Sequence, residues 1–343
     1  MKTVMPAALF CATAMALTMG GTASAEACTV RVTTWGGSYQ KSYQADVAAF
    51  EKAANCQVEW VVGSIADFRE KARLGQIDVV TGDIGLAVQG EAENLWMKLD
   101  PAKIPNMANL YDNAKYSESV VFANVGDYAL AYNSKKIEKA PESWEALWDP
   151  AYKNRVATFQ FDNVSTLGLT VMEAEKNGGS IDSIEPGLKK VAELVTGGNA
   201  VAMVSAETQL VSLFELEEAW IGVLTTGRFK ELWDKGADFV KLVRPPEGTF
   251  PVITTIMVSK STTVPDAAMQ FVNHVLSKQV QETFATKNLY APTVKNAELP
   301  ADFKYRDLLI SGDSFDRLFI PDQKKVAAHR AEWREQFMRL TSQ

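Results

Sequence analysis

Residues 28–62 read CTVRVTTWGGSYQKSYQADVAAFEKAANCQVEWVV, and their pattern is the strongest indication of the fold class. The β-branched residues at 29–34 predict one strand, and residues 57–62 predict a second. Two glycines follow the first strand, and we expect a helix from residue 38 to about residue 54. A strand, a helix and a second strand in this order indicate a parallel sheet covered by helices.

The first 25 residues have the parts of a secretory leader. Lys2 supplies a positive charge, residues 4–19 carry no charge and are almost all small or apolar, and small residues stand next to Ala25. These features predict export, with cleavage after Ala25. An uncleaved N-terminal anchor is the alternative, but the apolar stretch is short and rich in alanine and threonine for a membrane span.

The composition excludes some classes of function. The 343 residues carry a formal net charge of −7 at pH 7 and no long run of lysines or arginines. Such a chain lacks the basic surface with which proteins bind nucleic acids or anionic membranes. The length that remains without the leader is sufficient for two domains, each with a core of its own.

The two cysteines outside the leader predict a disulfide. Cys28 and Cys56 stand at the starts of the two strands predicted above. If these strands are parallel neighbours, their starts lie side by side at a distance that a disulfide can span. An exported protein favours this bond, and two buried free thiols are the alternative.

The order of elements predicts two lobes joined by a hinge. The chain begins one α/β unit, builds a second and returns to the first, with residues 120–132 and 252–259 as candidate crossover strands. A cleft between two hinged lobes is a common place for a ligand. The predicted segments are a leader (1–25), the first part of lobe 1 (26–131), lobe 2 (132–251), a return crossover with the rest of lobe 1 (252–300) and a C-terminal helical segment (301–343).

Four segments resemble a known family. They are TTWGGSY at 33–39, IDVV at 77–80, PESWEALWDPAYK at 141–153 and YAPT at 290–293. The third is similar to the family's S-W-x-x-L-W-x-P-x-Y-K stretch and is the most specific of the four. Over nearly the whole mature length, the chain resembles periplasmic solute-binding proteins of ABC importers, in the spermidine/putrescine-binding branch.

The resemblance implies both a fold and a role. The fold would be α/β, a two-lobed type II periplasmic binding protein in which each lobe is a mixed or parallel sheet flanked by helices, with two crossover hinge strands. The role would be that of a monomeric receptor in the periplasm, which captures a small solute, closes about its hinge and docks on a membrane permease. Neither a cofactor nor nucleic acid is expected.

The resemblance also implies ligand contacts. In polyamine-binding members, aromatic side chains surround the methylene chain and carboxylates bind the ammonium groups, an arrangement that uses cation–π contacts and charged hydrogen bonds. By matching position, Trp35, Tyr39 and Tyr290 would be the aromatic contacts and Asp162 a carboxylate contact. Asp83 would face the cleft from the loop after the third predicted strand.

The sequence departs from the polyamine-binding pattern at three positions. Ser165 stands where a second carboxylate is expected, Arg228 follows the glycine of a segment that lacks the family's tryptophan, and Thr254 stands in place of an aspartate. A guanidinium suits a carboxylate or phosphonate, because the two groups match bidentately. A polyamine or other amine-bearing solute is the first hypothesis, and the alternative is a carboxylate, amino-acid-like or aminophosphonate ligand anchored by Arg228. Thr254 is kept as a ligand candidate.

An exported enzyme on the same fold is the remote alternative. The sequence has no G-x-S-x-G, G-x-x-x-x-G-K or G-x-G-x-x-G motif. Its only histidines are His274 and His329, both on predicted C-terminal helices. We therefore predict no catalytic residues and no metal site.

Overall fold

One sheet runs through the whole molecule. The computed structural model describes Met1 and residues 28–342, so the predicted leader and its cleavage point after Ala25 lie outside the described residues. The strand order is β2-β1-β3-β9-β4-β7-β5-β6, and β8 pairs with β4 beside this path. The strands are β1 (Cys28–Thr34), β2 (Cys56–Val62), β3 (Val79–Gly82), β4 (Val121–Asn133), β5 (Val156–Phe159), β6 (Ala200–Val204), β7 (Ile221–Thr225), β8 (Val240–Val243) and β9 (Phe250–Val258).

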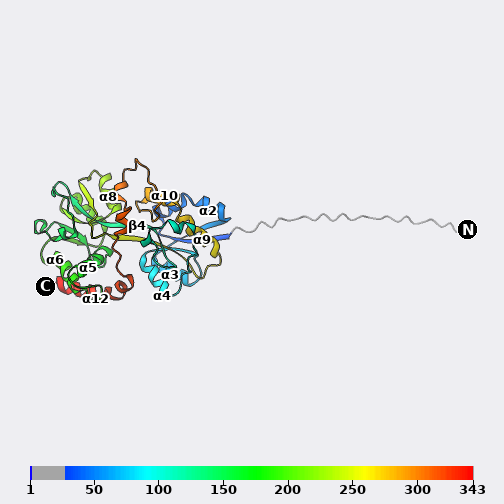
Figure 1. The fold of residues 1–343 in the computed structure, drawn as a ribbon, viewed down its shortest axis with the longest axis horizontal. Coiled ribbons are helices and arrows are strands. Elements are labelled where there is room, and N and C mark those ends of the chain that lie inside the picture. The colour runs from blue at the N-terminus through cyan, green and yellow to red at the C-terminus, as the bar shows by residue number, and fades with distance from the viewer. Residues whose placement is uncertain (2–27, 343) are drawn as a thin grey trace.

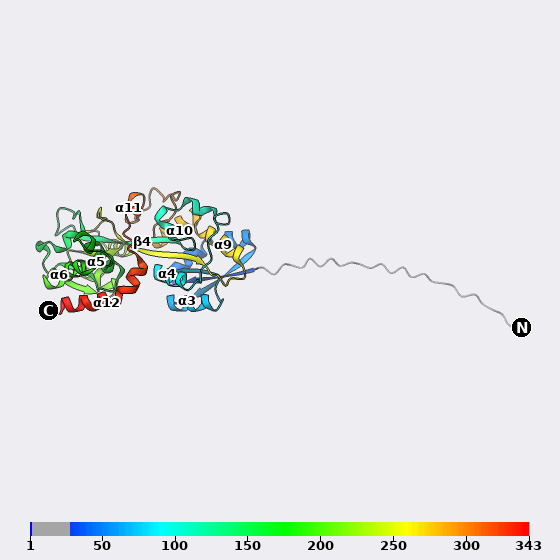
Figure 2. The ribbon, with the colours of Figure 1, turned by 60° about the horizontal axis from the view of Figure 1, so that its bottom comes forward.

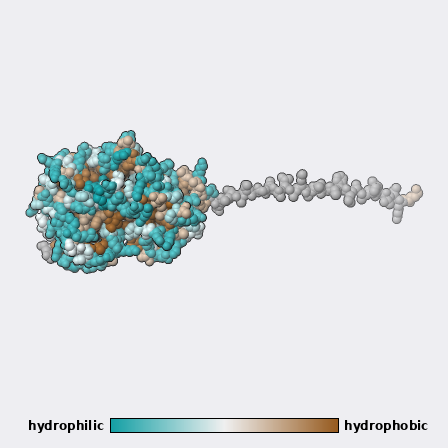
Figure 3. Space-filling model, in the orientation of Figure 1, coloured by the Kyte–Doolittle hydropathy of each residue, from teal (hydrophilic) through white to brown (hydrophobic). Residues whose placement is uncertain are grey.

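Helices cover the sheet at both of its ends, with β4 between the two groups (Figure 1). They are α1 (Gly37–Gln44), α2 (Val47–Ala54), α3 (Ile65–Arg73), α4 (Ile84–Ala92), α5 (Val164–Lys176), α6 (Glu185–Thr196), α7 (Glu207–Glu215), α8 (Thr226–Asp234), α9 (Pro265–Val275), α10 (Lys278–Asn288), α11 (Asp313–Asp316) and α12 (Gln323–Thr341). Within the described part of the chain, none is long and apolar enough to cross a membrane. Figure 3 shows a mainly hydrophilic face on which apolar patches are scattered.

The hydrophobic core is divided between two lobes, and the crossover strands belong to both. β4 places Phe122 in the core of the first lobe and Leu130 in that of the second. β9 likewise places Phe250 in the second core and Ile256 in the first. The predicted crossover strands and the two-lobed α/β fold are therefore confirmed. We keep the predicted lobe limits, which fall inside or beside these strands, as a proposal.

The helix predicted over residues 38–54 is two helices in the structure. α1 ends at Gln44, and α2 begins at Val47 after Asp46, whose φ of −115° leaves the helical path. α1 packs on α10, whereas α2 packs on α9 and β2. The prediction of one helix was wrong because a single straight helix cannot follow both surfaces.

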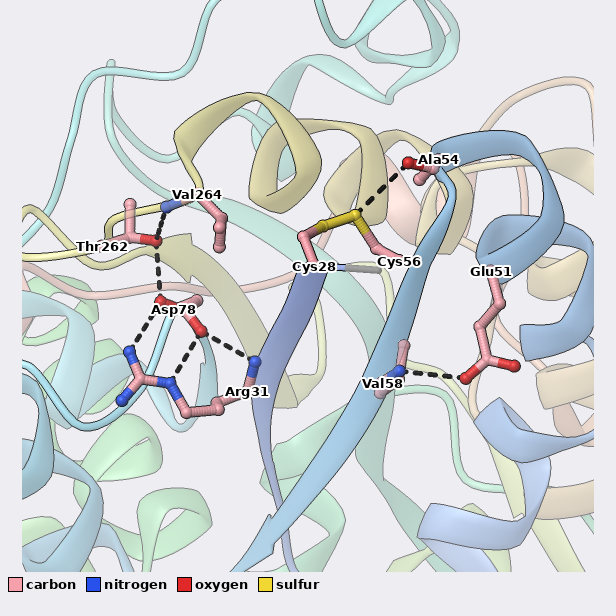
Figure 4. Close-up of a disulfide and its surroundings, with 9 residues drawn as sticks. All are labelled: Cys28, Arg31, Glu51, Ala54, Cys56, Val58, Asp78, Thr262 and Val264. Carbon is pink, nitrogen blue, oxygen red and sulfur yellow. Dashed lines mark hydrogen bonds and ion pairs between the residues drawn. A yellow bond between two sulfur atoms is a disulfide. The ribbon is translucent and has the colours of Figure 1, made fainter. Parts of the chain in front are cut away.

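Covalent and ionic links fix β1 to its neighbours. Cys28 and Cys56 form the predicted disulfide, because β1 and β2 are parallel and these two residues pair in register with their Cα atoms 4.4 Å apart. On the other side of β1, the buried carboxylate of Asp78 accepts hydrogen bonds from the backbone N–H of Arg31 at 2.8 Å and from its guanidinium at 2.9 Å (Figure 4). Burial alone would raise the pKa of Asp78, but the bonds from Arg31 lower it.

A buried ion pair joins the segments that meet at the hinge. Asp127 of β4 is fully buried and accepts hydrogen bonds from Arg244 at 2.8 and 3.1 Å and from the Thr249 hydroxyl at 2.9 Å. Arg244 also donates to the carbonyl of Leu308 at 2.6 Å. One carboxylate therefore connects β4, the segment between β8 and β9, and the chain that leads to α11.

The C-terminal segment is a third connection between the lobes. Phe315 packs in the first core, whereas Trp333 and Phe337 of α12 pack in the second. α12 lies along α6 and also contacts α4 of the first lobe. Figure 2 shows this helix in red below the second lobe, with its first turns toward α4.

The double variant Cys28→Ser, Cys56→Ser is expected to unfold more easily. The bond spans a sequence separation of 28 residues, and closing a loop of that size in the unfolded chain is worth about 3.6 kcal/mol. Urea unfolding of wild type and variant measures the difference. Solute affinity should not change, because the bond lies at the opposite end of β1 from Trp35. Equal stability of the two proteins would contradict a stabilising role for the bond.

Candidate ligand-binding site

Two adjoining arms of a cleft lie between the lobes. The polar arm, of about 450 Å³, is lined by Tyr39 and Tyr290 from the first lobe and by Glu207 and Arg228 from the second. The apolar arm, of about 140 Å³, is lined mainly by apolar side chains, among them Val164, Leu167, Phe250 and Phe319. Val252 of β9 lines both arms, so the arms meet at a crossover strand.

The residues of the polar arm stand near the starts of helices that follow strands. α1 starts three residues after β1, α7 starts at Glu207 after β6, and α8 starts at Thr226 directly after β7. In open α/β sheets, ligands bind beyond the carboxyl ends of the strands. The same local pattern in both lobes therefore brings Tyr39, Glu207 and Arg228 to one cavity.

Arg228 is bound by two carboxylates. Its Nε donates to Glu207 Oε2 at 2.6 Å, and its Nη1 donates to Glu231 Oε2 at 2.7 Å. Burial alone would lower the pKa of Arg228, but these two carboxylates raise it, so the guanidinium stays charged. Among the described residues, Nη2 has no hydrogen-bond partner, and 34% of the side chain is exposed. The arm therefore offers one cationic donor next to an anionic acceptor.

Aromatic rings form the first-lobe wall of the polar arm. Trp35 meets Tyr39 edge to face with their ring centroids 4.9 Å apart, and Tyr39 meets Tyr290 in the same way at 6.3 Å. Trp35 is 38% exposed, a large fraction for this side chain. Rings placed in this way can pack on an alkyl chain or receive an ammonium group.

The phenols near the polar arm are held in the neutral form. Burial raises the pKa of Tyr128 to about 12 and raises the pKa of Tyr39 and of Tyr290 above the ordinary value of 10.0. For Tyr39, hydrogen bonds with Thr254 and Asn124 oppose the effect of burial only in part. At neutral pH, these groups can donate and accept hydrogen bonds without adding charge.

The apolar arm contains few polar groups. Asp83 lines it and also caps α4, because its Oδ1 accepts the N–H of Leu86 at 2.7 Å. Tyr128 lines it as well, and its hydroxyl accepts a hydrogen bond from Asn163 Nδ2 at 3.3 Å. This arm suits the hydrocarbon part of a solute better than a charged group.

The structure brings together part of the predicted site. Four of the seven predicted ligand residues line the two arms: Tyr39, Asp83, Arg228 and Tyr290. Trp35 lines neither arm and packs against Tyr39, which lines the polar arm. Thr254 is only 4% exposed, and its hydroxyl lies in hydrogen-bond contact with Tyr39. Thr254 can therefore act on a solute through Tyr39.

Asp162 lies outside both arms. Its carboxylate is 3.4 Å from Arg330 and 3.2 Å from Arg334, and Arg330 also donates to its backbone carbonyl at 2.6 Å. Both arginines belong to α12, the C-terminal helix that packs on the second lobe. This placement does not support the predicted ligand role of Asp162. The sequence around Asp162 could not show it, because the arginines that bind its carboxylate lie about 170 residues later in the chain.

Three residues outside the predicted ligand set lie at or behind the arms in the structure. Glu207 forms the ion pair with Arg228, Tyr128 lines the apolar arm, and Asn124 donates to Tyr39. The sequence offers Glu207 as a candidate at a loop end of the second lobe, but its local sequence does not show the partner Arg228 that brings it into the arm. Tyr128 and Asn124 lie within a long buried strand, where the sequence alone does not distinguish a site residue from a core residue.

The comparison with known families decides the class of protein. The profile described as bacterial extracellular solute-binding protein matches residues 45–308. The chain belongs to this family. Like other members, it is a solute-binding component of an ABC transporter, and the predicted resemblance is confirmed. The solved structures it resembles include ABC transporter substrate-binding proteins.

One curated relative of this solute-binding protein is a gamma-aminobutyric acid-binding protein from Pseudomonas aeruginosa. The two are 29% identical over 139 residues, which are 39% of this chain and 39% of the relative. The match thus covers about two fifths of the relative's length.

Solved structures match over nearly the whole chain. An ABC transporter protein from Clostridium perfringens is 25% identical with a TM-score of 0.81, over 91% of this chain and 99% of its own. A GABA receptor is 22% identical with a TM-score of 0.70, over 91% and 97%. A spermidine/putrescine substrate-binding protein from Streptococcus pneumoniae is 19% identical with a TM-score of 0.70, over 92% and 99%. The last two likenesses establish the fold alone.

The buried phenols predict a pH dependence of stability. A folded-state pKa above the unfolded value means that the folded protein retains protons that the unfolded chain releases first. The stability contributed by neutral Tyr39, Tyr128 and Tyr290 is therefore complete below about pH 10 and is lost as the pH rises through the folded-state pKa values. Urea unfolding at several alkaline pH values should show a shallower loss for Tyr39→Phe than for wild type. Parallel losses would contradict the burial of this phenol.

Proposed function

We propose that this solute-binding protein is a periplasmic receptor for a small zwitterion that carries one amine and one carboxylate, such as γ-aminobutyrate. It captures the solute between its lobes and delivers it to a membrane permease, and its role is binding without catalysis. The observation that supports the proposal is the ion pair of Arg228 and Glu207 in the polar arm, opposite Tyr39 and Tyr290.

The two charges of this pair match the two charges of the solute. The Nη2 group of Arg228 would donate to the solute carboxylate, since guanidinium–carboxylate contacts are strong and directional. The carboxylate of Glu207 would accept from the ammonium group. The rings of Tyr39 and Tyr290 would pack on the methylene groups between the two charges.

A polyamine fits this arm less well. A dication needs carboxylates at both ends, whereas the strongest group of the arm is a guanidinium that would repel it. The predicted carboxylate Asp162 is bound to two arginines of α12, and Thr254 carries no charge. The proposed solute therefore combines the two sequence-based hypotheses: it carries the amine of the first and the carboxylate of the alternative.

The names of two similar proteins support the same class of solute. The curated relative is named for gamma-aminobutyric acid, and one solved neighbour is a GABA receptor. The polyamine-binding neighbour shares the fold at lower sequence identity.

Contact with both lobes explains how the solute would close the receptor. A ligand shifts an open–closed equilibrium only if it binds the closed form more tightly. A solute in the polar arm touches α1 and the Tyr290 loop on one side and α7 and α8 on the other. Each set of contacts is complete only when the lobes are together.

Calorimetric titration with γ-aminobutyrate and with putrescine tests the proposal. Wild type is expected to bind the first and not the second. Arg228→Lys keeps the charge but loses the fork of donors and should weaken binding by about tenfold or more. Glu207→Gln, which removes the acceptor charge, should weaken it to a similar degree.

Two control variants make the result specific. Asp162→Asn changes a carboxylate outside both arms and should leave the affinity unchanged. Asp83→Asn keeps a side chain that can cap α4, so a loss of affinity in this variant would place the ammonium group in the apolar arm instead of at Glu207. Binding of putrescine alone, with no effect of Arg228→Lys, would overturn the proposal.

A further inference from the structure

The hinge strand β4 contains an irregularity directly behind the ligand-binding wall. Its pairing with β9 shifts register between Phe122 and Asn124, so that Ala123 has no partner of its own on β9. Bulges of this kind re-aim neighbouring side chains and are frequent next to functional sites. The side chain that follows the shift is Asn124, which is only 2% exposed.

Asn124 connects β4 to two tyrosines of α1. Its Nδ2 donates to the hydroxyl of Tyr39 at 3.1 Å and to that of Tyr43 at 3.0 Å. Both hydrogens of the amide are thereby used. Tyr39 lines the polar arm, whereas Tyr43 is a buried core residue that does not line it. The Tyr39 hydroxyl also lies 3.5 Å from the Tyr43 hydroxyl and in hydrogen-bond contact with Thr254, so the protein itself surrounds this hydroxyl and the ring is left to face the polar arm.

The same short segment also holds the second tyrosine of the arm. Val125 exchanges backbone hydrogen bonds with Ala291, the residue after Tyr290, at 3.2 and 2.6 Å. The carbonyl of the bulged Ala123 accepts from Gln281 Nε2 at 2.7 Å, and Gln281 Oε1 accepts the N–H of Thr293 at 2.8 Å. Residues 123–125 thus support both first-lobe tyrosines of the polar arm.

Packing alone would not favour an amide side chain at position 124. Its Oδ1 is buried without a hydrogen-bond partner in the described part of the chain. A buried polar atom left unpaired is destabilising, so this amide lowers stability through its Oδ1 while its Nδ2 satisfies the hydroxyls of Tyr39 and Tyr43. Residues that lower stability at a site often serve function.

We infer that Asn124 is a positioning residue for solute binding, which holds the hydroxyl of Tyr39 and thereby fixes the ring of Tyr39 in the wall against which the solute packs. The residue does not touch the solute itself. Because Asn124 belongs to a crossover strand, it also ties the binding wall to the hinge. The inference about solute affinity rests on the proposed function, whereas the inference about the orientation of Tyr39 does not.

The first experiment needs no ligand. Wild type and Asn124→Leu, both carrying 3-fluorotyrosine, are compared by ¹⁹F NMR, and the Tyr39 signal is assigned by its absence from Tyr39→Phe. We expect a shifted or broadened Tyr39 signal in folded Asn124→Leu, with a free energy of unfolding below that of wild type because two buried hydroxyls lose a hydrogen bond. An unchanged Tyr39 signal would overturn the inference. Asn124→Ser, which keeps a polar group but cannot reach both phenols, replaces the leucine variant if that variant does not fold.

The second experiment measures affinity for γ-aminobutyrate by calorimetry. Asn124→Leu should weaken binding about fivefold to tenfold, the size of the hydrogen bond that no longer holds Tyr39 in place. In the Tyr39→Phe background, the same change should add less than about twofold, because the group that it positions is already absent. Tyr43→Phe is the matched control, since it removes the other bond of the same amide and a long 3.5 Å contact with Tyr39 but keeps the bond from Asn124 to Tyr39, and should leave the affinity within about twofold.

The outcomes separate the two proposals. Equal losses from Asn124→Leu with and without the Tyr39 hydroxyl would show a general structural effect and overturn the positioning role. Failure of wild type to bind γ-aminobutyrate would contradict the proposed solute. In that case the ¹⁹F comparison still decides whether Asn124 orients Tyr39.

Discussion

The antiparallel pairing of β4 with β9 is the interaction on which the rest of the structure depends. These two strands lie next to each other at the centre of the sheet and belong to both hydrophobic cores. They hold the two lobes in one sheet and leave the cleft between the helices that flank them. The Asp127–Arg244 ion pair fixes them on the side of the second lobe, and the bulge at Ala123 bends β4 on the side of the first. A rotation of the lobes must therefore be absorbed by these strands and by the C-terminal segment.

The chemistry of the site follows from what this frame brings together. In each lobe, strands end and the following helices begin at the cleft. Residues far apart in the chain therefore line one cavity. The first lobe contributes rings and neutral phenols, and the second contributes an arginine bound by two glutamates. The Arg228–Glu207 ion pair faces the polar arm, and the Nη2 group of Arg228 has no partner among the described residues. Such a pair suits a solute that carries both a positive and a negative charge.

Much of the fold could be predicted because its signals are local. The strands at 28–34 and 56–62, the disulfide between their first residues and the two crossover strands all follow from short stretches of sequence. The break between α1 and α2 could not be predicted, because it depends on which elements each half packs against. The placement of Tyr39, Tyr290 and Arg228 was predictable from position after strands or from family resemblance.

The rest of the site depends on contacts between distant segments. Asp162 looks like a ligand carboxylate in its local sequence, yet arginines of α12 bind it. Asn124 lies in a strand of buried residues, and only its hydrogen bonds to Tyr39 and Tyr43 distinguish it from the core. Arg228 lines the polar arm, and its role as the discriminating residue stays a prediction, whereas its partner Glu207 was not among the predicted ligand residues.

A crystal structure of the mature protein with γ-aminobutyrate bound would test the central claim most directly. We predict closed lobes, the solute carboxylate within hydrogen-bond distance of Arg228, the ammonium group at Glu207, and the ring of Tyr39 or Tyr290 against the methylene groups. A solute bound to one lobe only, or bound away from Arg228, would contradict both the proposed chemistry and the proposed mechanism of closure.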